Sequence, residues 1–150
     1  MKERRKPKQA SLKRAISTAY YALFHLLLDD GMRLIAPSKP DGLRTIVRRA
    51  FSHSDMLAMC RAVQNNGWQA KLMSKPIARE MLIVTKAFED LQEARHSADY
   101  DPAKVFKRVV ALSYLETLDQ AFLAWSATRA SLDAQIFLFA MFLGKRWGRV

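Results

Sequence analysis

The sequence predicts an all-α protein, an antiparallel helical bundle of about five or six helices. Its composition supports this, because Gly and Pro occur only five times each among 150 residues while Ala, Leu, Lys and Arg are abundant. Its periodicity supports it as well, because apolar residues recur at three- and four-residue spacing over most of the chain. At this length we expect a single domain.

The domain is expected to have three parts. A basic tail covers residues 1–9, the bundle covers 10–127, and an apolar helix with a basic tail covers 128–150 and packs on the same domain. The remaining helix boundaries follow from the apolar periodicity and the turn residues. The helices are expected at about 11–28 (extending to 35 at most), 43–51, 55–64, 76–94, 102–127 and 132–143. In the 43–51 helix, we expect four residues to face inward: Leu43, Ile46, Val47 and Ala50.

One polar stretch, Arg95 to Pro102, lies where two long helical patterns meet. The preceding helix is expected to begin at Ser74-Lys75-Pro76 and to reach its last turn at Arg95. Asp101 suits the N-cap of the next helix and Pro102 its first position. The stretch is therefore predicted to be a hinge between two antiparallel helices.

The charge indicates a polyanionic partner. The chain carries 25 basic and 14 acidic residues, a net charge of +11, and its first 14 residues hold much of the excess. This charge is complementary to three kinds of partner: nucleic acid, an acidic protein and an anionic membrane surface. A basic terminus is also a common solvated feature without a partner.

Several kinds of site and location are not expected. No Cys/His cluster has the spacing of a zinc site, and no glycine-rich phosphate loop is present, so we expect neither a metal nor a cofactor. Cys60 is the one cysteine, is expected in the core, and suits a reducing, cytoplasmic location. The longest apolar run, 136–143, is too short to span a bilayer, and no signal peptide is recognised.

A polar stripe runs along the first helix beside its apolar stripe. Its members, at steps of four, three, four and four, are Arg14, Thr18, Tyr21, His25 and Asp29. These steps place them on one helical face. Three interpretations remain open: a solvent-facing side, a second interface, or the wall of a polar cleft.

Two of these segments together resemble the HEPN domain family. The run from Arg14 to His25, with Ala-Tyr-Tyr-Ala-Leu-Phe-His at its end, is similar to the first helix of that family. The run from Arg95 to Tyr100 is similar to the Arg-x-x-x-Asp-Tyr signature of small prokaryotic members. The resemblance covers roughly residues 10 to 127. It implies a helical bundle that forms homodimers, contacts RNA or nucleotides, and in many members cleaves RNA without a metal.

The resemblance also implies which residues form the site. Active members carry an Arg followed, after four to six residues, by a His, often with a Tyr two residues before the His. Arg95 and Tyr100 match this pattern, but Pro102 stands where the His is expected. A His is well suited to moving the protons of RNA cleavage, and an Arg to neutralising the charged phosphate. His96 is adjacent to Arg95 and projects about 100° around the helix, so His25 is the better substitute.

Three functions therefore remain. The first is a catalytically degenerate HEPN-like protein that binds RNA or a nucleotide in a toxin–antitoxin, defence or regulatory system, with a nucleotidyltransferase as a candidate partner. The second is an active metal-independent ribonuclease, with Arg95 and His25 as catalytic residues. The third is a non-enzymatic dimerisation or partner-binding module, in which the apolar last helix binds a partner or a second copy. A purely structural role of the 95–102 stretch also remains open, in which Arg95 and Asp99 pair and brace the helix hairpin. The residues expected at an RNA or anion site are Arg95, Tyr100, Asp99, His96, Arg14 and Tyr21.

Overall fold

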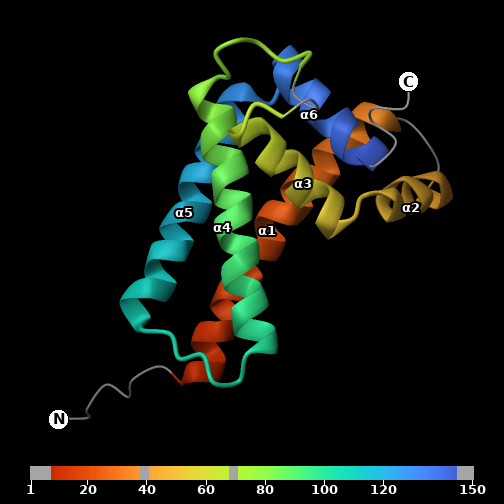
Figure 1. Cartoon of the computed structure of the whole chain (residues 1–150). Coiled ribbons are helices and arrows are strands. Elements are labelled where there is room, and N and C mark those ends of the chain that lie inside the picture. The colour runs from red at the N-terminus through yellow and green to blue at the C-terminus, as the bar shows by residue number, and fades with distance from the viewer. Residues whose placement is uncertain (1–7, 38–40, 68–70, 145–150) are drawn as a thin grey trace.

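The computed structural model describes residues 8–37, 41–67 and 71–144 (Figure 1). The described residues form six helices and no strand, which confirms the predicted all-α bundle. The helices are α1 (Gln9–Ile35), α2 (Asp41–Ala50), α3 (His53–Gln64), α4 (Arg79–Tyr100), α5 (Arg108–Thr128) and α6 (Leu132–Leu143).

Three long helices, α1, α4 and α5, pack against one another and form the body of the bundle (Figure 1). In Figure 1, α4 runs opposite to both α1 and α5. Shorter helices complete the core: α3 packs on α4, and α6 packs across α1 and α3. The largest fully buried side chains come from all of these helices except α2 and include Tyr20, Met56, Phe88, Trp125 and Phe137. Each such side chain contributes about 1.5–3 kcal/mol by leaving water.

The apolar periodicity predicted the central parts of the helices well. Helix α1 continues to Ile35, the furthest end expected, and α6 covers residues 132–143 as expected. The Ser52 hydroxyl caps α3 by accepting a hydrogen bond from the Asp55 N–H at 3.1 Å. Cys60 is fully buried, as expected.

The predicted hinge at 95–102 is wrong. The run from Arg95 to Tyr100 forms the last turns of α4, Asp101 follows as the C-cap residue, and α5 begins only at Arg108. The Asp101 carboxylate accepts the Ala103 N–H at 3.0 Å, so it closes a turn instead of capping a helix.

The physical reason for the late start of α5 is a contact from α1. The Gln9 side chain donates to the Phe106 carbonyl at 2.7 Å and accepts the Phe106 N–H at 2.8 Å. Both backbone groups of Phe106 are satisfied outside a helix, while its ring is buried against a small apolar cluster that includes Leu12 and Ile16. Pro102 therefore lies in a loop at 101–107, well outside the Arg95 helix face.

The predicted start of the long helix at 74–76 is also wrong, because α4 begins at Arg79. The backbone N–H of Ser74 donates to the buried carboxylate of Asp133 on α6 at 3.0 Å. This contact holds the segment before α4 against α6 in a non-helical path. A third correction concerns α2: Val47 is buried as expected, but Leu43 and Ile46 are 40% and 66% exposed, and Ala50 is exposed as well.

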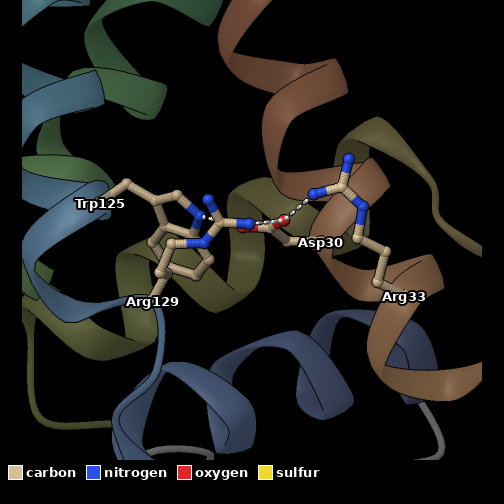
Figure 2. Close-up of polar contacts among 4 residues, drawn as sticks. All are labelled: Asp30, Arg33, Trp125 and Arg129. Atoms are coloured by element: carbon tan, nitrogen blue, oxygen red, sulfur yellow. Dashed lines mark hydrogen bonds and ion pairs between the residues drawn. The ribbon is translucent and has the colours of Figure 1, made fainter. Parts of the chain in front are cut away.

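A buried carboxylate joins the end of α1 to the end of α5 (Figure 2). Asp30, 7% exposed, accepts the Trp125 indole N–H at 2.6 Å and an Arg129 N–H at 2.6 Å. Arg33 approaches the same carboxylate at 3.4 Å from the next turn of α1. Asp30 thus satisfies a buried indole and neutralises its own charge with two arginines, which is how a carboxylate is tolerated in a core.

Candidate functional site

Arg95 lies at the centre of a polar and aromatic group of side chains between α1 and α4. Its side chain is 14% exposed, and its guanidinium donates to the Tyr21 hydroxyl at 2.8 Å and to the Asp99 carboxylate at 3.0 Å. The Arg95–Asp99 ion pair, which the purely structural interpretation of this stretch requires, is therefore present, within α4. Asp99 in turn accepts the Ser17 hydroxyl at 2.6 Å, so this pair braces α4 against α1.

Three tyrosine rings surround the guanidinium. The Arg95 Cζ lies 5.4 Å from the centre of the Tyr20 ring, 5.2 Å from that of Tyr21 and 5.7 Å from that of Tyr100. Each distance is within the range of a cation–π contact. Tyr20 is buried, whereas Tyr100 is 65% exposed. The group therefore has a closed side in the core and a side open to solvent.

His53, at the start of α3, completes this group. Its ring stacks on Phe24 with centres 4.2 Å apart and lies edge-on to Tyr21 at 6.1 Å. Its Nδ1 is in hydrogen-bond contact with the Tyr20 hydroxyl. We call these six residues the Arg95 cluster: Tyr20, Tyr21, His53, Arg95, Asp99 and Tyr100.

The environment of the cluster favours neutral forms of both His53 and Tyr20. Burial lowers the pKa of His53, and the charges of Arg95 and His25 lower it further. Burial raises the pKa of Tyr20 above its ordinary value, so the phenol keeps its proton. Because that proton has no water to reach, the Tyr20 hydroxyl donates to Nδ1, and His53 carries its own proton on Nε2.

This arrangement predicts the pH response of His53. By NMR, His53 should titrate with a midpoint below the ordinary value of about 6.5. The unfolded chain then binds the proton more tightly than the folded chain. The contribution of His53 to the free energy of unfolding is therefore fully present above pH 6.5. It falls as the pH decreases below 6.5, by at most about 1.4 kcal/mol per pH unit. Urea unfolding of wild type and His53→Phe measures this loss, which the variant should lack. A midpoint at or above 6.5 in the folded chain would contradict the assignment.

The other histidines expected at the site lie at its edges. His25 is exposed, and its ring stacks on Tyr21 with centres 6.2 Å apart. His96 is exposed as well, and its ring lies 5.0 Å from that of Tyr100. Neither ring has a hydrogen bond to a residue of the cluster, whereas His53 is bonded to the Tyr20 hydroxyl.

The polar stripe of α1 is mainly a solvent-facing side. Arg14, Thr18, His25 and Asp29 are exposed, and Tyr21 is the member that turns inward to Arg95. Arg14 lies about two turns before Tyr21 along α1, outside the cluster. Of the residues expected at an anion site, the structure thus gathers Arg95, Tyr21, Asp99 and Tyr100, places His96 at the rim, and leaves Arg14 apart.

Sequence reasoning missed His53 and Tyr20. His53 follows the capping Ser52, so the residues around it indicated only a helix start. The signal that it belongs to the site is tertiary: α3 packs on α4 in the opposite direction, as the pairing of Arg61 with Glu89 and of Gln64 with Thr85 shows. The start of α3 therefore reaches the part of α4 that carries Arg95.

Part of the hydrogen-bonding capacity of the Arg95 guanidinium is unused within the described chain. Two of the five N–H groups of the guanidinium are used by Tyr21 and Asp99, and the described residues take none of the other three. Two cavities, of about 350 and 490 Å³, lie beside α4, and no residue of the cluster lines either one. Within the described chain, no group of His, Cys, Asp and Glu side chains is arranged to hold a metal ion.

The comparisons with known proteins add no relative. Neither the protein-family models, nor the curated proteins, nor the solved structures give a match to this chain. Among the described residues, no helix combines the length and the apolar character needed to cross a bilayer.

Proposed function

We propose that this chain is a HEPN-like protein that binds single-stranded RNA through the Arg95 cluster, without efficient cleavage. The observation that carries the proposal is the guanidinium of Arg95, which uses two of its five N–H groups, beside the exposed ring of Tyr100. A guanidinium with N–H groups to spare suits a phosphate, and an exposed aromatic ring suits an unstacked base. An open cluster, without an enclosing cavity, favours an extended strand over a free nucleotide.

The charge around this end of the bundle supports the same ligand. The Lys13 amine reaches the Asp101 carbonyl at 3.3 Å, which brings the start of α1 beside the 101–107 loop. Lys104 and Lys107 on that loop are exposed, as is Arg14 on α1. Basic side chains on both segments would meet successive phosphates, and the net charge of +11 adds attraction at longer range.

Weak or absent catalysis follows from the loop that carries Pro102. This residue offers no proton donor or acceptor on its side chain, and it lies beyond the end of α4. A setting in a toxin–antitoxin, defence or regulatory system, with a nucleotidyltransferase as a candidate partner, rests on the family resemblance alone. RNA binding by the cluster requires neither this biological setting nor the nucleotidyltransferase partner.

One observation favours the active ribonuclease as a second candidate. His53 is neutral and belongs to the group that surrounds Arg95, which makes it a better acid/base than His25. In that reaction, Nδ1 of His53, once released by the Tyr20 hydroxyl, would accept the proton of the ribose 2′-OH. The 2′-oxygen would bond to phosphorus, the P–O5′ bond would break, and the imidazolium would return a proton to the leaving 5′-oxygen. Arg95 would neutralise the phosphate charge. A relocated histidine would thus replace the one that the family carries after the Arg.

Filter binding of single-stranded RNA over a salt series tests the first proposal. If Arg95 contacts a phosphate, Arg95→Ala should reduce the affinity and flatten the salt slope by about 0.7. Arg79→Ala is the matched control, because it removes the same charge from the other end of α4, about 24 Å away. Arg95→Lys, which keeps the charge, provides a second variant. Absence of wild-type binding at low salt would refute the proposal, and so would equal effects of the two alanine variants.

Incubation of RNA with the purified chain in EDTA tests the second candidate. The degenerate form predicts no cleavage above background. The active form predicts cleavage that is lost in both Arg95→Ala and His53→Ala but retained in His25→Ala. Loss in His25→Ala alone would return the catalytic role to His25 and contradict the assignment to His53.

A further inference from the structure

A cavity of about 350 Å³ lies between α4, α5 and the loop that joins them. From α4, Asp90, Glu93 and Ser97 line it, and their three- and four-residue spacing places them on one helical face. Tyr114 and Thr117 line it from α5. The volume is in the range of small-ligand sites, and polar side chains from separate segments converge on it.

Two opposite charges in this cavity lack an ion-pair partner in the described part of the chain. They are Glu93 on α4 and Lys104 on the loop, and they do not pair with each other. The Lys104 amine lies over the Phe106 ring, 5.7 Å from its centre. Asp90, by contrast, is paired with Lys86 at 3.0 Å. A ligand that carries both an ammonium group and a carboxylate would satisfy Glu93 and Lys104 together.

The hydroxyl groups of the cavity can add hydrogen bonds to such a ligand. Among the described residues, the hydroxyls of Ser97 and Tyr114 have no hydrogen-bond partner. The hydroxyls of Ser113 and Thr117 donate to backbone carbonyls at 2.6 and 3.0 Å, so their oxygens remain able to accept. Hydroxyl oxygens suit an ammonium group as acceptors, and hydroxyl protons suit a carboxylate as donors.

A second cavity, of about 490 Å³, continues the first one along α4. The two are contiguous, because Asp90 and Thr117 line both. The apolar lining of the second cavity comes from α4 and consists of Leu82, Ile83 and Ala87. This cavity can therefore take the apolar part of a ligand whose charged groups lie in the first one.

We propose that the two cavities together bind a free α-amino acid with a large apolar side chain. The Glu93 carboxylate accepts hydrogen bonds from the α-ammonium group, and the Lys104 amine donates to the α-carboxylate. The side chain of the ligand extends past Asp90 into the second cavity. A phosphate does not suit the first cavity, because Asp90 and Glu93 repel it.

This site is separate from the proposed RNA site, since no residue of the Arg95 cluster lines either cavity. Lys104 is the residue that the two proposals share, because it is also one of the basic side chains expected to meet the RNA. The inference does not rest on RNA binding, and the binding of an amino acid is measured without RNA. Failure of one proposal therefore leaves the other standing.

Isothermal titration calorimetry of the full chain with L-phenylalanine and L-leucine tests the proposal. Saturable binding is expected, with a dissociation constant of about 1 mM or lower. Phenethylamine lacks the carboxylate of phenylalanine and 3-phenylpropionate lacks its ammonium group, so each should bind about tenfold more weakly or worse. Glycine lacks the side chain and should also bind about tenfold more weakly.

Two substitutions that remove a charge locate the ligand. Glu93→Gln and Lys104→Met should each weaken binding of L-phenylalanine about tenfold, because each removes a charge-assisted hydrogen bond. Glu116→Gln on α5 and Lys107→Met on the loop are the matched controls, since both residues are exposed and line neither cavity. Glu93 and Lys104 are exposed as well, so all four variants should fold, which circular dichroism checks.

Each contrary result overturns a stated part of the proposal. Absence of saturable binding of both amino acids would overturn it entirely, and so would unchanged affinity in both Glu93→Gln and Lys104→Met. Phenethylamine that binds as tightly as L-phenylalanine would leave a site for cations alone and remove the role of Lys104. Binding that Arg79→Ala weakens and Lys104→Met does not would overturn the orientation, because Arg79 lines the second cavity.

Discussion

Asp30→Ala is expected to lower the free energy of unfolding by about 2–4 kcal/mol, because it removes the shared acceptor at the junction of α1 and α5. The indole of Trp125 is 1% exposed, so its N–H has no water to replace the lost carboxylate. Arg129 and Arg33 lose their ion pair but are 44% and 68% exposed, and both guanidiniums regain water. That hydration keeps the loss below the value for a fully buried pair.

Urea unfolding monitored by circular dichroism measures this effect against a neighbouring control. Asp29 is exposed, and Asp29→Ala should change the stability by less than about 0.5 kcal/mol. Trp125→Phe removes the indole N–H and leaves Asp30 with its arginines, so it should cost less than Asp30→Ala. Equal stabilities of Asp30→Ala and Asp29→Ala would mean that the contacts drawn in Figure 2 do not stabilise the fold.

Helix interiors could be predicted from the sequence because they depend on neighbours within a few residues. The three- and four-residue spacing of Leu23, Leu27 and other apolar residues predicts α1, and the same rule predicts α6 to the residue. The cap of α3 is local as well, because Ser52 and Asp55 are three residues apart. These features need no knowledge of the rest of the chain.

Helix ends at the site could not be predicted because contacts over long sequence separations determine them. Asp101-Pro102 has the composition of a helix start, yet Gln9 holds Phe106 outside a helix from 97 residues away. The buried Asp133 draws Ser74 out of the predicted start of α4 in the same way. An N-cap residue stabilises a helix start by only about 1 kcal/mol, so several tertiary contacts together outweigh it.

The contacts of the candidate site also differ in whether they join residues that are near or far apart in the sequence. The Arg95–Asp99 pair is one helical turn long and was predictable, whereas the Tyr21 hydroxyl reaches Arg95 across 74 residues. His53 enters the site only through the packing of α3, and Asp30 finds Trp125 across 95 residues. Sequence reasoning therefore identified four of the six residues of the cluster, and the fold supplied Tyr20 and His53.

Arg95→Ala should lower the free energy of unfolding by about 2–3 kcal/mol, because Arg95 is both a brace and a cation among aromatic rings. The variant loses the bonds to Tyr21 and Asp99 and the cation–π contacts with three rings. Urea unfolding measures the loss, with Arg61→Ala as a control. Arg61 is exposed and pairs with Glu89 at 3.8 Å, so its removal should cost less than about 0.5 kcal/mol.

This loss makes Tyr100 the sharper probe of function, since its ring is 65% exposed and contributes little to the core. Tyr100→Ala should retain nearly all of the stability yet bind single-stranded RNA about tenfold more weakly, the effect of one lost base stack. Arg95→Lys should fold but bind RNA weakly, because a lysine keeps the charge without the planar fork. If both variants fold and bind RNA like wild type, the cluster is a brace between α1 and α4, and the basic side chains alone attract the RNA.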